Sequence, residues 1–181
     1  MNRLFIFGFV LIFTTIVLGK TQEHRHHEAH VHGAATLGIA FDDRNGQVEF
    51  KAAASGVFGF EHQVKSDKDK KKLVEIIKIF ETSIGSMIQF DESVECVFSK
   101  EKIELLPESQ VHDKITKSHH GEHSDFVANF KVKCKKDIKG TKVTFDFSQF
   151  KGLHDLDVTL LVGDIQKSIE VKQKPMTLEL K

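Results

Sequence analysis

The 181-residue chain has no tryptophan and no tyrosine, and it has only two prolines and two cysteines. Without Trp and Tyr it is poorly equipped to stack against bases or sugars. Its 26 basic and 26 acidic side chains cancel, so it lacks the basic surplus that phosphate binding requires. These absences argue against a nucleic-acid partner. The abundant residues are 16 phenylalanines and 11 histidines.

Long hydrophobic runs are also scarce, and the one that stands out lies at the N-terminus. Arg3 precedes an apolar stretch over residues 4–18, and Gly19 supplies a small residue for cleavage. This order predicts a signal peptide over residues 1–19. The stretch is shorter than the roughly 20 residues that span a bilayer. We expect an exported protein with a flexible His-rich tail over residues 20–29 and a single domain over residues 30–181.

The two cysteines are expected to pair with each other. In an oxidising compartment Cys96 and Cys134 should form a disulfide. Each lies in a stretch where apolar residues alternate, which puts both sulfurs on the core side. The bridge closes a loop of about 38 residues and contributes about 4 kcal/mol in the chain-entropy model. With no other cysteine, we expect no zinc site made of thiolates.

Apolar residues recur mostly at every second position after the signal. Residues 30–54 predict a β-hairpin with its turn over Asp42-Asp43-Arg44-Asn45-Gly46, which contains the Asn-Gly signature. Residues 55–60 predict an irregular connection, and residues 107–123 a polar loop. Further strands are expected at 93–99, 102–106, 124–134, 141–147, 155–163, 165–172 and from residue 176, with a tight turn at Gly163-Asp164.

One segment has helical rather than strand periodicity. Ser66 can cap a helix with Asp69 at the third helical position, and apolar residues then recur at helical spacing up to Gly85. One main amphipathic helix among many strands predicts an α+β fold with a mostly antiparallel β-sheet, in a single domain.

The histidines fall into two groups, five from His24 to His32 and four from His112 to His123. His30 and His32 occupy polar positions of the first strand and share one face, which suits two ligands to one metal ion. His62 lies at the junction before the helix. His123 enters a strand on its polar face. These four are the candidate ligands for a Zn²⁺ ion, with a carboxylate as the other option for the fourth position.

The remaining histidines are weaker candidates. Those in the tail and the polar loop cannot impose a coordination geometry, and they are His24, His26, His27, His119 and His120. His154 precedes a strand and is expected to be a surface or hydrogen-bonded histidine. The helix carries no pair of zinc-binding histidines with an adjacent glutamate, and no serine-nucleophile motif is present. Glu61, Asp125 and Asp155 are available carboxylates.

The ordered series Ala29-His30-Val31-His32-Gly33, Gly59-Phe60-Glu61-His62 and Phe150-x-Gly152-Leu153 resembles the ZrgA family of periplasmic zinc-uptake proteins. The similarity is strongest over residues 29–62. It implies a periplasmic zinc-binding protein that works beside an ABC-type importer in Gram-negative bacteria and meets the membrane only through that transporter. The loop over residues 107–123 is shorter than in the family, so we expect one structured site rather than storage of several ions.

Three functions remain open from the sequence. The first is a non-enzymatic protein that captures Zn²⁺ through His30, His32 and His62 and supports its uptake. The second is a zinc-dependent hydrolase with an open coordination position, for which Glu61 is the one suggestive base. The third is a secreted interaction domain with incidental histidines. Imidazole also binds Cu²⁺ and Ni²⁺, so the pattern alone does not select the metal.

Overall fold

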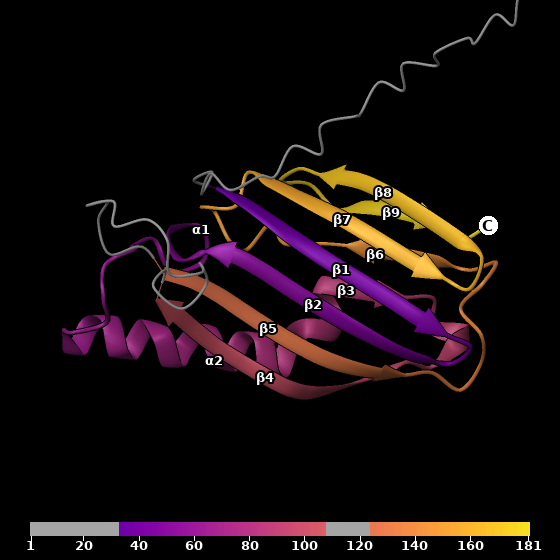
Figure 1. Cartoon of the computed structure of the whole chain (residues 1–181), viewed down its shortest axis with the longest axis horizontal. Coiled ribbons are helices and arrows are strands. Elements are labelled where there is room, and N and C mark those ends of the chain that lie inside the picture. The colour runs from indigo at the N-terminus through magenta and orange to yellow at the C-terminus, as the bar shows by residue number, and fades with distance from the viewer. Residues whose placement is uncertain (1–32, 108–123) are drawn as a thin grey trace, which may run out of the picture.

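A computed structural model describes residues 33–107 and 124–181. The described strands are β1 (Ala34–Asp42), β2 (Asn45–Ala53), β3 (Ile88–Phe90), β4 (Val97–Pro107), β5 (Ser124–Lys133), β6 (Lys142–Phe145), β7 (Asp155–Val162), β8 (Ile165–Val171) and β9 (Met176–Glu179). Two sheets result, a six-stranded sheet in the order β4-β5-β2-β1-β7-β8 and a three-stranded sheet in the order β3-β6-β9 (Figure 1).

The first two strands form the predicted hairpin, but its first strand and its turn differ from the prediction. β1 begins at Ala34 rather than at residue 30, because Gly33 lies in a turn with φ of 82°. Asp42 pairs with Asn45, so the connection consists of Asp43 and Arg44. Asp43 adopts the positive φ of 52° that such a tight turn needs. The Asn-Gly pair belongs to β2, where Gly46 lies opposite Phe41. Placing Asn45-Gly46 in the turn was therefore wrong.

The large sheet is mixed, because β1 pairs with β7 in parallel while every other pair of described strands is antiparallel. The predicted α+β class with a mostly antiparallel sheet in a single domain is confirmed. The predicted strands at 93–99 and 102–106 are one strand, β4, with an irregularity between Lys100 and Lys102. The tight turn at Gly163 is confirmed, with φ of 57°.

The main helix, α2 (Asp67–Met87), begins at the predicted capping box. The Ser66 side chain accepts from the backbone N–H of Asp69, and the Asp69 side chain accepts from the backbone N–H of Ser66. Residues 55–60, predicted as irregular, instead contain the short helix α1 (Ala54–Phe58). Gly59 ends α1 with φ of 81°, a conformation that glycine adopts without strain.

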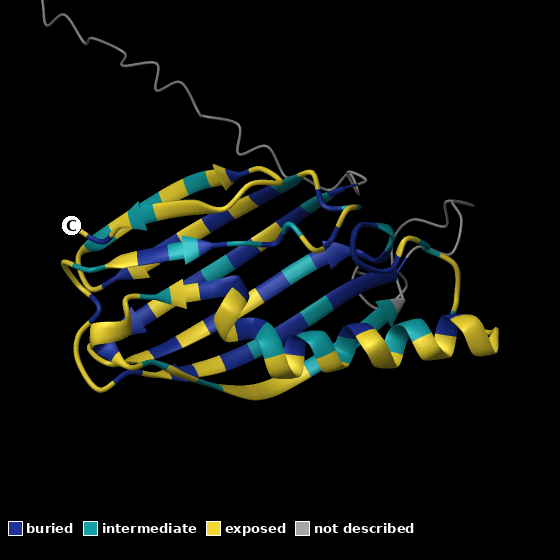
Figure 2. Cartoon of the chain, turned by 180° about the vertical axis from the view of Figure 1, so that it is seen from behind, coloured by how far each residue is buried: buried dark blue, intermediate teal, exposed yellow. Residues whose placement is uncertain are grey.

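The hydrophobic core lies against one face of the large sheet. Figure 2, viewed from behind, shows α2 and the small sheet on that face, and Figure 1 shows no described helix across the opposite face. Alternation along each strand explains this arrangement, since successive side chains of β2 are exposed and buried in turn. Phe50 of β2, Phe80 of α2 and Phe126 of β5 are fully buried, and the Phe80 ring lies 5.0 Å from Phe50 and 4.8 Å from Phe126.

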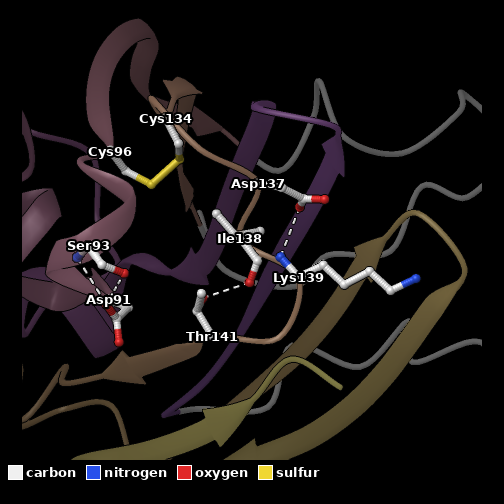
Figure 3. The surroundings of a disulfide bond; sticks show 8 residues. All are labelled: Asp91, Ser93, Cys96, Cys134, Asp137, Ile138, Lys139 and Thr141. Atoms are coloured by element: carbon white, nitrogen blue, oxygen red, sulfur yellow. Dashed lines mark hydrogen bonds between the residues drawn. A yellow bond between two sulfur atoms is a disulfide. The ribbon is translucent and has the colours of Figure 1, made fainter.

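The predicted disulfide between Cys96 and Cys134 is confirmed (Figure 3). It joins the residue just before β4 to the residue just after β5 and closes a separation of 38 residues. The strand expected from residue 93 starts later than predicted, because residues Glu92–Val94 form a short 3₁₀ helix, η1. Glu95 ends η1 with a positive φ of 46°.

Two predictions fall outside the described residues, the signal peptide over residues 1–19 and the tail over residues 20–29. The predicted polar loop over residues 107–123 also lies outside them except for Pro107, which belongs to β4. Within the part of the chain that the structure describes, no helix has both the length and the hydrophobicity to cross a membrane.

Candidate metal site

At one end of the large sheet lie the described residues that adjoin the candidate ligands in the sequence. β1, β5 and β7 begin at this end, and β2 and β4 end there, as the pairs Ala34 with Asp155 and Pro107 with Ser124 show (Figure 1). We call it the site end. Gly33 and Ser124 both lie here, on strands that flank β2. Neighbouring strands are about 4.8 Å apart, so β1 and β5 are separated by about 10 Å.

Gly33 fixes the start of β1 to the turn before β7. Its carbonyl oxygen accepts hydrogen bonds from the backbone N–H of His154 at 2.7 Å and of Asp155 at 3.2 Å. Gly33 has φ of 82°, and a Cβ built on it would lie 2.6 Å from Cδ2 of His154. Only glycine fits there. The backbone that follows His32 in the sequence is therefore held in one place.

A second close contact holds α1 at the same end. A Cβ on Gly152 would lie 2.7 Å from the carbonyl oxygen of Gly56 and 2.9 Å from that of Ser55. The turn before β7 and the helix α1 thus meet backbone to backbone. This contact explains physically why both segments need small residues.

His62 is connected to the start of β5 by a series of aromatic rings. The ring of Phe126 in β5 lies 5.3 Å from that of Phe58 in α1, and Phe58 lies 5.7 Å from Phe60. The imidazole of His62 stacks on Phe60 with 4.7 Å between ring centres and an interplanar angle of 27°. The side chain of His62 is 61% exposed, so an ion can reach it from solvent.

A carboxylate lies beside the imidazole. Nε2 of His62 is 3.3 Å from Oδ2 of Asp69. The pKa of Asp69 is below its ordinary value of 3.8, mainly because of the Ser66 side-chain hydrogen bond, with a smaller effect from His62. An ionised carboxylate can only accept hydrogen bonds, so this contact favours the His62 tautomer with its proton on Nε2. The lone pair of the neutral ring is then on Nδ1.

The three carboxylates noted in the sequence each have a partner. The contacts are Ser55 Oγ to Glu61 Oε1 at 2.6 Å, Lys51 Nζ to Asp125 Oδ2 at 3.0 Å and Lys172 Nζ to Asp155 Oδ1 at 2.6 Å. The Asp125 side chain is only 2% exposed. Glu61 directly precedes His62 in the sequence and is the nearest of the three to it. It is therefore the best carboxylate candidate for a metal ligand.

His154 fulfils the prediction of a hydrogen-bonded histidine. Its Nδ1 lies 2.9 Å from Nε2 of Gln173, and its backbone N–H is bonded to Gly33. His154 therefore lies at the site end, but it is not one of the predicted ligands.

His62 is the one predicted ligand that lies within the described residues. The other candidates are outside them, so their role stays a prediction: His24, His26, His27, His30, His32, His119, His120 and His123. Within residues 33–107 and 124–181, no group of three His, Cys, Asp or Glu side chains could hold a metal ion. A tetrahedral ion at His62 therefore needs ligands from the rest of the chain.

The sequence did not identify two neighbours of His62. Asp69 was recognised only as part of the capping box, and Phe60 only as part of a motif. The signal for Asp69 was present, since a capping-box carboxylate lies at the start of the helix and His62 lies four residues before Ser66. The ring stacking with Phe60 depends on the backbone path after α1, which sequence patterns do not give.

An exposed imidazole backed by a carboxylate is typical of metal-binding proteins, and here it lies at the end of a mixed sheet in an α+β domain. The chain matches the ZrgA family of zinc uptake proteins over residues 29–180, and it belongs to that family. The resemblance noted in the sequence is thereby confirmed. No curated protein matches the chain. Membership gives zinc uptake as its role and zinc as the ion it handles.

Proposed function

We propose that this chain is a non-enzymatic periplasmic protein that captures Zn²⁺ through histidine ligands and supports its uptake by an ABC-type importer in a Gram-negative bacterium. The observation that carries the proposal is the state of His62. Its ring is exposed and its Nε2 faces the carboxylate of Asp69, a contact that favours the tautomer in which Nδ1 has the lone pair that a zinc ion needs.

The arrangement of the described strands supports convergence of the other ligands. His32 directly precedes Gly33 and His123 directly precedes Ser124 in the sequence, and both Gly33 and Ser124 lie at the site end. About 10 Å separates β1 from β5. Side chains that extend toward each other from two such strands can meet at one ion. His30, two residues from His32, adds the second ligand from the same segment.

In this proposal His30, His32 and His62 are three ligands of a tetrahedral ion, and His123 or Glu61 is the fourth. The zinc ion is cargo, so binding must be reversible. Protons compete with it, because a protonated imidazole cannot bind metal. Zinc affinity should therefore fall as the pH drops below about 6.5.

Zinc titration of the mature chain at neutral pH tests the proposal. We expect a tight site that is lost in the double variant His30→Ala/His32→Ala and in His62→Ala. His154→Ala is the matched control, since this histidine is already bonded to Gln173 and should leave the tight site intact. Deleting residues 20–28 should remove only weaker binding. A mature chain that binds no zinc at neutral pH would end the proposal.

Separate experiments test the export of the chain and its role in zinc uptake. Mass measurement of the exported protein should show a chain that begins after Gly19, and an intact Met1 would contradict export by a cleaved signal. Cells that depend on this chain should grow poorly in low zinc when they carry His62→Ala. Chelator-sensitive hydrolysis in a substrate screen would contradict a non-enzymatic role.

A further inference from the structure

We propose that Asp69 is a positioning residue for zinc, which holds His62 as the Nε2–H tautomer and directs Nδ1 to the ion. This inference rests on the proposed function, in which His62 binds zinc. Asp69 would then have two roles, one in the capping box of α2 and one in orienting His62. The distance between Nε2 of His62 and Oδ2 of Asp69, 3.3 Å, is the contact on which the inference depends.

The carboxylate of Asp69 is fixed by the helix itself. Its Oδ2 accepts from the backbone N–H of Ser66 at 3.2 Å, while the Asp69 N–H donates to Oγ of Ser66 at 3.1 Å. Asp69 is only 9% exposed. The acceptor for His62 is therefore held in place by a two-way backbone interaction before any ion binds, and it needs no rearrangement on binding.

The imidazole is restrained from a second direction. Phe60 covers one face of the ring at 4.7 Å, while Asp69 holds Nε2. A ring that is held at one face and at one nitrogen has its other nitrogen aimed in a defined direction. With 61% of the side chain exposed, Nδ1 is the ring nitrogen left to bind the ion.

The expected effect is large enough to measure. Removing the carboxylate behind a metal-binding histidine typically weakens metal affinity by 10–100-fold, because the ring loses both orientation and basicity. The competing explanation is that Asp69 serves only the helix. Ser66→Ala separates the two, since it removes the hydroxyl of the cap but leaves the Asp69 carboxylate beside His62. Ser66→Ala and Asp69→Ala each remove one hydrogen bond of the capping box, so they should weaken the start of the helix by similar amounts.

The experiment compares Asp69→Ala, Asp69→Asn, Ser66→Ala and His62→Ala in the mature chain. Zinc affinity is measured by competition with a chelator of known affinity, and long-range ¹H–¹⁵N NMR of the metal-free chain gives the His62 tautomer. We expect Asp69→Ala to bind zinc about 10–100-fold more weakly. Asp69→Asn, which keeps a neutral acceptor, should fall between it and the wild type. Ser66→Ala should bind like the wild type.

The tautomer keeps the inference testable even if Asp69→Ala does not fold. The wild type should carry the proton on Nε2, and Asp69→Asn should shift the population toward Nδ1–H. A wild-type ring protonated on Nδ1, or an equal loss of affinity in Ser66→Ala and Asp69→Ala, would overturn the positioning role. If His62→Ala loses zinc while Asp69→Ala does not, only this inference fails. If His62→Ala binds like the wild type, the proposed site fails with it.

Discussion

Replacing Gly152 by alanine tests the backbone contact that holds α1 at the site end. The new Cβ would lie 2.7 Å from the Gly56 carbonyl oxygen and 2.9 Å from the Ser55 carbonyl oxygen, whereas ordinary contacts begin at 3.4 Å. Both atoms are backbone, so neither can rotate away, and α1 or the turn must move by roughly half an ångström. Overpacking of this kind costs about 1–3 kcal/mol.

Thermal unfolding followed by circular dichroism measures that cost. For a domain of this size each kcal/mol lowers the melting temperature by about 2–4 °C, so we expect a fall of about 2–12 °C. The matched control is Gly85→Ala in α2, where the nearest atom to the new Cβ is Cδ2 of Phe98 at 3.6 Å. The same substitution there should raise stability by up to about 1 kcal/mol, because alanine favours a helix.

The displacement should also reach the metal site, since the segment that carries His62 follows α1 directly. Zinc affinity is therefore expected to fall in Gly152→Ala and to stay unchanged in Gly85→Ala. A Gly152→Ala chain with the stability and the zinc affinity of the wild type would refute the argument that the site end depends on this contact.

Three further predictions concern stability and the His62 ring. The Cys96→Ala/Cys134→Ala variant should lose about 4 kcal/mol of unfolding free energy; a reductant should then have no further effect, and equal denaturant midpoints with the wild type would contradict this. Hydrogen bonds from Ser93, chiefly from its side chain, lower the pKa of Asp91 (Figure 3). The stability that Asp91 contributes is present above its ordinary pKa of 3.8 and is lost as the pH falls through the lowered folded value, so Asp91→Asn should flatten urea midpoints measured across that acid range. Phe60→Leu keeps an apolar side chain but removes the stacking ring, and it should weaken zinc binding more than it lowers the melting temperature.

Much of the fold could be predicted because it depends on local patterns. The alternation of β2 and β5 gave their buried faces, and the capping box at Ser66 gave the start of α2. The parallel pairing of β1 with β7 could not be predicted, since the alternation of apolar residues is the same in parallel and antiparallel strands. The hairpin turn is shorter than predicted, since Asn45 and Gly46 pair with Asp42 and Phe41. A Cβ on Gly46 would lie 2.5 Å from the Phe41 ring, a close approach that the turn preference of Asn-Gly does not reveal.

The candidate metal site was likewise predicted only in part from the sequence. The sequence singled out His62 because it lies at the junction before the helix, where an irregular backbone can aim a side chain toward the hairpin. It could not show that the ring stacks on Phe60 or faces Asp69, because both contacts depend on how the chain turns between α1 and α2. The alternation that predicted one face for His30 and His32 does not continue from β1 through Gly33, which lies in a turn with positive φ, so the direction of these side chains stays a prediction.

The most direct test of the account is a crystal structure of the zinc-loaded chain with anomalous diffraction measured at the zinc edge. The account predicts a strong zinc peak at the site end, about 2.0–2.1 Å from Nδ1 of His62 and from imidazole nitrogens of His30 and His32. A zinc peak elsewhere on the chain, with His62 bound to no metal, would contradict it.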